Sequence, residues 1–153
     1  MSIRLSSNPR NIPPMAGWLG ALGLLPFLAG AALTLYPPVS APVDWAFAAR
    51  AYAALILAFL GGARFGFAVV DDNLRRQGGA LFFAVLPALV AWAALLLPPA
   101  LCIAVLMGGF FVLGLMDVFS VRPGVRPWYG RLRLRLTIVL LIALAVMLRG
   151  AQP

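Results

Sequence analysis

Long apolar stretches alternate with short polar or proline-rich breaks along the chain. The apolar stretches cover residues 17–35, about 46–70, 80–97, 100–119 and about 134–148. The breaks between them read YPPVSAP, DDNLRRQG, PP and SVRPGVRPWYG, and such runs of proline, glycine and charge interrupt helices. Because ~20 helical residues cross the roughly 30 Å hydrocarbon core of a bilayer, each apolar stretch predicts a membrane-spanning helix.

The predicted fold class is all-α, a polytopic membrane bundle of five transmembrane helices. The stretches lack the apolar–polar alternation of barrel strands, and a helix satisfies its backbone hydrogen bonds internally, as lipid requires. The fifth stretch is the shortest. It reaches a spanning length when Leu132 joins it and when Arg131, Arg133 and Arg149 extend their guanidinium groups towards the lipid headgroups.

Composition supports lipid as the solvent for most of this surface. Hydrophobic residues make up 63% of the 153 residues, whereas a soluble chain has roughly 45–50%. The chain has no histidine and a single cysteine, Cys102. It therefore lacks an imidazole base, a histidine metal site, an internal disulfide and an iron–sulfur ligand set. We expect no enzyme activity, no cofactor and no metal.

The arginines predict the orientation of the chain. If five helices span the membrane, one face carries Arg4, Arg10, Arg75, Arg76, Arg122, Arg126, Arg131, Arg133 and Arg135, and the other carries Arg149. Positive residues accumulate on the cytoplasmic side. We therefore expect a cytoplasmic tail over residues 1–16, one domain over 17–148 and an external tail over 149–153, in a bacterial inner membrane. A net charge of +8 distributed at helix ends does not predict nucleic-acid binding.

Two alternatives modify this topology. The first helix could be a signal peptide cleaved after AGA (29–31) or VSA (39–41), although the apolar run is long for a signal and Pro42 follows the second site. Residues 23–38 also align without gaps on 84–99, with all three prolines matched. Helices 1–2 and 3–4 would then be two repeated hairpins followed by a fifth helix; chance similarity in an Ala/Leu-rich chain is the other explanation.

A stripe of small residues marks the second stretch. Ala58, Gly62 and Gly66 recur every four residues and therefore share one face of a helix. Small residues in this register allow two membrane helices to approach closely. We predict that this stripe packs against another helix, and that the second helix is the centre of the bundle.

Arg64 lies in the same stretch and points away from the stripe. Three explanations are open for a guanidinium at this depth. It pairs with Asp117, near the same membrane face on the fourth helix; it extends alone towards the headgroups; or it contacts an ion or substrate.

A basic segment precedes the fifth stretch. Its residues are Arg126, Trp128, Arg131, Arg133 and Arg135. Arg131 and Arg135 share a helical face with Trp128, whereas Arg133 lies on another. The segment either binds anionic lipid headgroups or sets the topology and anchors the helix at the membrane surface.

Several of these segments together resemble a known family. GWLGALGLLPFLAGAAL, AYAALILAFLGGARFGFA, the Asp117 segment and WYGRLRLRLT are similar to small bacterial membrane proteins grouped as a domain of unknown function. Eukaryotic relatives of that family resemble a small mitochondrial transmembrane protein. The resemblance covers about residues 17–148 and implies an inner-membrane location without an established activity. Phe65 stands where the family more often has tryptophan.

Three functional hypotheses follow. The first is a non-enzymatic protein that binds or assembles a partner complex, its partners being the bilayer and another membrane protein or a second copy of itself. The second is a transporter or channel for a small solute or ion that uses Arg64 and Asp117 near helix kinks at Pro26 and Pro87. The third, an enzyme acting on a membrane-embedded substrate, would depend on the four aspartates, Asp44, Asp71, Asp72 and Asp117.

Overall fold

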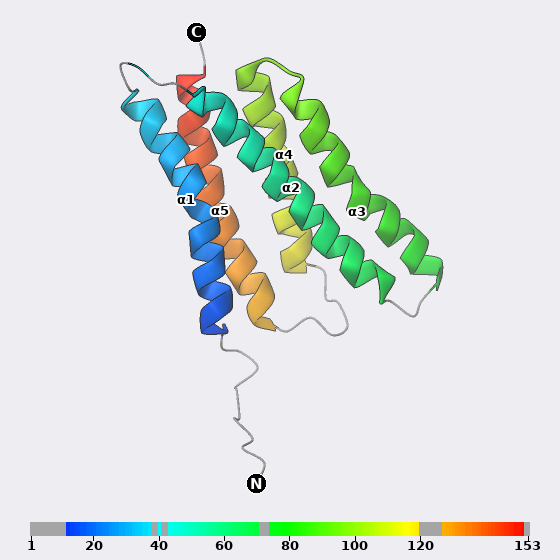
Figure 1. The fold of residues 1–153 in the computed structure, drawn as a ribbon. Coiled ribbons are helices and arrows are strands. Elements are labelled where there is room, and N and C mark those ends of the chain that lie inside the picture. The colour runs from blue at the N-terminus through cyan, green and yellow to red at the C-terminus, as the bar shows by residue number, and fades with distance from the viewer. Residues whose placement is uncertain (1–11, 38–39, 41–42, 71–73, 120–126, 152–153) are drawn as a thin grey trace.

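The computed structural model describes residues 12–37, 40, 43–70, 74–119 and 127–151. All the helices and strands in this part of the chain are α-helices, so the described residues contain no strand. The helices are α1 (Pro14–Leu35), α2 (Trp45–Val69), α3 (Leu74–Leu95), α4 (Pro99–Phe119) and α5 (Pro127–Gly150) (Figure 1). The prediction of an all-α bundle is confirmed, with one helix for each apolar stretch.

Four of the described helices are long and apolar enough to cross a membrane: α1, α2, α3 from Gln77 and α4 up to Asp117. The fifth helix, α5, is not in this group, because arginines flank its apolar section on both sides. It has 24 residues and is about 36 Å long at 1.5 Å per residue. It also packs against α1 and α4. Membrane crossing by α5 stays a prediction.

Two helices begin six or seven residues earlier than predicted, a larger difference than at the other three. Hydropathy placed their starts at residues 80 and 134, but α3 begins at Leu74 and α5 at Pro127. Hydropathy detects the section of a helix that lies in hydrocarbon, whereas backbone hydrogen bonding continues through the basic residues before it. Proline suits the first position of α5 because an N–H there has no partner within the helix.

The helices are arranged with α1, α3 and α5 running in one direction and α2 and α4 in the other (Figure 1). The most extensive packing joins α2 to α3, followed by α1 to α5 and α4 to α5. Both α2 and α4 pack against three other helices, so the centre of the bundle is shared between them. The two predicted hairpins, α1–α2 and α3–α4, are present as consecutive antiparallel helices, but neither is the main unit of packing.

The interior is filled by aromatic and aliphatic side chains from all five helices. The Phe27 ring of α1 meets the Phe110 ring of α4 edge to face, with 6.1 Å between centroids. It also meets the Tyr52 ring of α2 at 5.2 Å. The Tyr52 hydroxyl donates a hydrogen bond of 3.0 Å to the Gly23 carbonyl, three residues before Pro26. These contacts hold α1 against the rest of the bundle near its internal proline.

The glycines of α2 pack differently from the prediction. A methyl group placed on Gly61 would come within 2.7 Å of the Ala84 carbonyl oxygen and 3.1 Å of the Pro87 ring, so Gly61 allows the close approach of α3. Gly62 and Gly66 are exposed, and a methyl group on either meets no atom within 4 Å. The prediction that the Ala58, Gly62 and Gly66 stripe packs within the bundle was wrong. Spacing identifies residues that share a face, but the covered face is the one that carries Arg64.

Candidate functional site

Arg64 lies on the buried face of α2. Leu57, Leu60, Gly61 and Ala68 are buried on the same side, which gives this face the spacing expected of an α-helix. The Arg64 side chain is 7% exposed. A charged side chain in a membrane helix faces the bundle interior because lipid offers it no hydrogen-bond partner. Arg64 therefore marks the inward face of α2.

Asp117 provides the partner for Arg64. It lies in the last turn of α4, and its side chain is 6% exposed. Arg64 Nη1 donates to Asp117 Oδ1 at 2.6 Å, a length typical of a strong charge-assisted hydrogen bond. Of the three explanations open for Arg64, the pairing with Asp117 matches this geometry. The pair brings together two residues that are 53 positions apart in the sequence.

A second arginine completes the site. Arg133 of α5 donates from Nε to Asp117 Oδ2 at 3.1 Å, and its side chain is 11% exposed. Each carboxylate oxygen therefore accepts from a different guanidinium group. We name Arg64, Asp117 and Arg133 the arginine–aspartate cluster. The sequence offered one signal for the third member, because Arg133 falls on a different helical face from Arg131 and Arg135.

The arginine–aspartate cluster connects helices that do not approach each other closely. The backbones of α2 and α5 make no close contact over the described residues, yet both helices reach Asp117 through arginine side chains. The Phe67 ring of α2 and the Tyr129 ring of α5 add an edge-to-face contact at 5.9 Å. Gly114 lies against Thr137, so α4 and α5 are close together about one helical turn from the cluster, towards the middle of the bundle. One carboxylate thus holds α2, α4 and α5 at the same end of the bundle.

The residues predicted to bind lipid differ in exposure and in their contacts. Arg126 lies outside the described residues. Arg131 and Arg135 are exposed, and Trp128 is half-buried with its ring 6.2 Å from that of Tyr129. Arg133 is directed to Asp117 instead of lipid, so its assignment to the lipid-contact set was wrong. Arg133 lies on the face of α5 that packs against α4, and the buried Asp117 carboxylate is on that side.

Both oxygens of Asp117 are engaged by arginine side chains. Oδ1 accepts from Arg64 and Oδ2 from Arg133. Among the described residues, no group of three or more His, Cys, Asp or Glu side chains is placed to hold a metal ion. Cys102 is a buried free thiol in the core.

Comparison with known proteins places the fold in a family. Transmembrane protein 69 of Xenopus tropicalis is 34% identical over 144 residues, which covers 88% of this chain and 54% of that protein. Transmembrane protein 69 of Mus musculus is 32% identical over 139 residues, covering 89% of this chain and 56% of that protein. The chain spans about half the length of these relatives. No solved structure matches it.

The family match includes the arginine–aspartate cluster and all five helices. The family model described as "protein of unknown function (DUF3429)" matches residues 12–149. This range runs from just before α1 to the last turn of α5. The chain belongs to the DUF3429 family of membrane proteins.

Proposed function

We propose that this chain is a non-catalytic component of a membrane complex, which binds another membrane protein along α2. The observation that carries the proposal is the exposed face of α2 at Gly62 and Gly66, where a methyl group added to either glycine would meet no atom within 4 Å. Glycines four residues apart allow the backbone of a second helix to approach closely. The exposed face of α2 therefore has the form of a helix-binding surface.

The side chains next to Gly62 and Gly66 support the same role. Leu55 and Phe59 are each 68% exposed, and their spacing to Gly62 and Gly66 places all four on one side of α2. Exposed apolar side chains alone are normal for a helix in lipid. The two exposed glycines next to large apolar side chains are the additional feature, because the backbone of a partner helix can approach closely there and gain van der Waals contacts.

The arginine–aspartate cluster supports an assembly role over transport. A transporter that used Arg64 and Asp117 would need them to exchange partners during its cycle. Both carboxylate oxygens are already bound to arginines from two helices. Breaking these contacts would leave buried charges unpaired, which is costly. The cluster is better suited to fixing the helices than to passing a solute.

The decisive experiment is isolation of the full chain in mild detergent with Gly62→Leu and its control, Gly108→Leu. Gly108 on α4 is also exposed and has no atom within 4 Å of an added methyl group. We expect a stoichiometric membrane-protein partner with the wild type and with Gly108→Leu, and its loss with Gly62→Leu. Thermal stability of the isolated chain should be equal in all three, because neither glycine packs within the bundle.

Other results would contradict this proposal. If the Gly62→Leu variant retains the partner, the face of α2 at Gly62 and Gly66 is not the binding surface. A homo-oligomer that dissociates on Gly62→Leu would replace the foreign partner with a second copy of the chain. Solute flux in vesicles that contain the purified protein alone would favour the transporter hypothesis instead.

The proposed location is a bacterial inner membrane, with the N-terminal end of α1 on the cytoplasmic side. Arginines of the described helices support this orientation, since Arg131, Arg133 and Arg135 lie at the same end of the bundle as the start of α1. Reporter fusions at Gln77 and Gly130 should give cytoplasmic signals, and a fusion at Gln152 an external signal. A cytoplasmic signal from the fusion at Gln152 would mean that α5 does not cross the membrane.

A further inference from the structure

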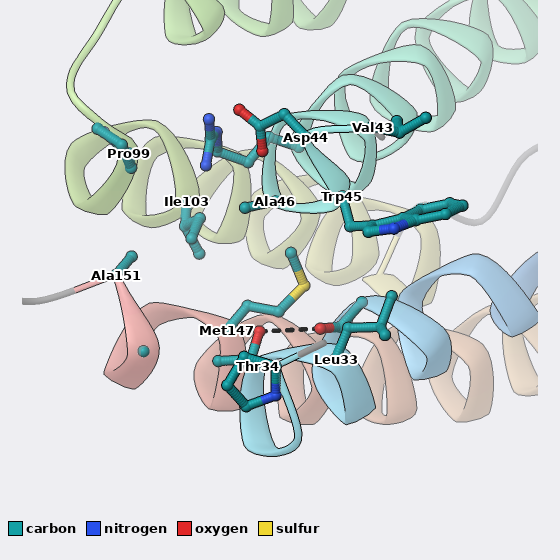
Figure 2. A pocket seen from close by; sticks show the side chains of 14 residues that line it. Leu33, Thr34, Val43, Asp44, Trp45, Ala46, Pro99, Ile103, Met147 and Ala151 are labelled. Atoms are coloured by element: carbon teal, nitrogen blue, oxygen red, sulfur yellow. Dashed lines mark hydrogen bonds between the residues drawn. The ribbon is translucent and has the colours of Figure 1, made fainter. Parts of the chain in front are cut away.

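A pocket opens at the end of the bundle opposite to the arginine–aspartate cluster (Figure 2). It lies between the last turns of α1 and α5 and the first turns of α2 and α4. Its volume is about 640 Å³, within the roughly 300–1,000 Å³ common for sites that bind small molecules. Nothing in the proposed assembly role accounts for this pocket.

The inner walls of the pocket are apolar. Leu33 of α1, Ile103 of α4 and Met147 of α5 contribute to them, and Figure 2 shows Met147 directed between the helices. The polar Thr34 is already engaged, because its hydroxyl donates a hydrogen bond of 2.8 Å to the Gly30 carbonyl. An occupant must therefore present an apolar part to these walls.

Two charged residues line the pocket, Arg50 in α2 and Asp44 at its N-cap. Arg50 is half-buried and lies beside the Phe47 ring, with 5.9 Å from its guanidinium carbon to the ring centroid. It forms no ion pair with any residue that the structure describes. Asp44 is exposed and accepts a hydrogen bond of 2.8 Å from the Phe47 N–H, as the N-cap of α2. The guanidinium group of Arg50 is therefore available to an anion.

The two charged side chains differ in exposure. Arg50 is half-buried and Asp44 is exposed, so Asp44 is the nearer of the two to water. Arg50 is six residues after Asp44, and helical side chains lean towards the N-terminus, so its guanidinium group is directed back towards this end of α2. The pocket therefore offers apolar walls, a guanidinium group and a carboxylate. A phospholipid with a primary ammonium headgroup carries the complementary groups, which are acyl chain, phosphate and ammonium.

The pocket also lies at the depth of lipid headgroups. Tyr36, just after α1, and Trp45, at the start of α2, are exposed at this end of the bundle. Tyr and Trp collect at membrane–water interfaces because their rings have an apolar body and a polar edge. We propose that the pocket binds phosphatidylethanolamine, with Arg50 contacting the phosphate and Asp44 the ammonium group.

The test measures lipid binding to the full chain by native mass spectrometry, with phosphatidylethanolamine, phosphatidylglycerol and inorganic phosphate as separate probes. The wild type should bind phosphatidylethanolamine more tightly than phosphatidylglycerol, and phosphate alone should not be retained. Arg50→Gln should weaken binding of both lipids at least ten-fold. Asp44→Asn should remove only the preference between them, because asparagine keeps a side-chain oxygen for the N-cap.

Arg149→Gln is the matched control. Arg149 is an exposed arginine at the same end of the bundle but does not line the pocket, and its replacement should leave binding unchanged. Equal losses for Arg50→Gln and Arg149→Gln would overturn the proposal, since general charge attraction would explain both. Equal wild-type binding of the two lipids, or retention of inorganic phosphate alone, would also overturn it. Thermal stability without added lipid verifies that each variant is folded.

Discussion

Charged side chains are paired and buried at one end of the bundle, and they line an open pocket at the other. At one end Asp117 accepts hydrogen bonds from Arg64 and Arg133, and the three side chains are largely buried. At the other, Arg50 and Asp44 line an open pocket without pairing with each other. The charged side chains at Asp117 come from three helices, whereas Arg50 lies in α2 and Asp44 is the N-cap of the same helix. A charge pair that joins separate helices contributes to the fold, while charges presented along one helix remain available to a ligand.

The largest effect should come from removing Asp117. Asp117→Leu removes the carboxylate that accepts hydrogen bonds from both guanidinium groups. We expect a loss of about 3 kcal/mol in the free energy of unfolding, at the lower end for a broken buried pair because Arg133 is partly exposed. Arg64→Leu and Arg133→Leu should each cost less, since either leaves one arginine paired with Asp117. Thermal unfolding in detergent measures all three.

A double variant sharpens this prediction. Arg64→Leu combined with Asp117→Leu also removes one of the two guanidinium groups that Asp117 brings together, so their mutual repulsion is lost and the double variant should be more stable than Asp117→Leu alone. Strictly additive losses would show that the residues act independently. If Asp117→Leu is no worse than Arg64→Leu, the carboxylate is not the common partner of both arginines, and the contrast between the two ends fails.

A smaller effect separates packing from charge. Gly61 lies one helical turn before Arg64 and directly against α3, so Gly61→Leu should destabilise the isolated chain by about 1–3 kcal/mol through overpacking. Gly62→Leu, one position along, should have little effect on the same thermal transition because its side chain would face open space. Equal losses would indicate that both faces of α2 are covered.

The sequence predicted the helices, and it offered two of the three members of the cluster, Arg64 and Asp117, as one explanation for Arg64. Apolar stretches of membrane-spanning length determine the helices, and the direction of successive spans placed Arg64 and Asp117 near one face. Spacing separated Arg133 from Arg131 and Arg135, but it did not show which of the two helical faces meets α4, because that depends on the rotation of α5 against α4. That rotation is set by contacts such as Gly114 against Thr137, which sequence spacing does not encode.

The glycines of α2 also show that sequence spacing does not identify which face of a helix is covered. Ala58, Gly62 and Gly66 have the regular spacing of a packing stripe, while Gly61 belongs to no such stripe. Arg64 was the better guide to the covered face, because a charge must face the interior in lipid whereas glycine is tolerated on either side. The pocket was also not predicted, since its lining comes from four helix ends that are distant in the sequence.

The position of the cluster has a consequence for biosynthesis. A ribosome makes α2 and α4 before α5, so Arg64 and Asp117 are both in the chain before Arg133 is added. The earlier pair has no net charge, and four helices can therefore associate at this point without an unbalanced buried ion. The last helix then adds a positive charge to a carboxylate that is already positioned. Folding of this end of the protein is thus compatible with the order in which its helices are made.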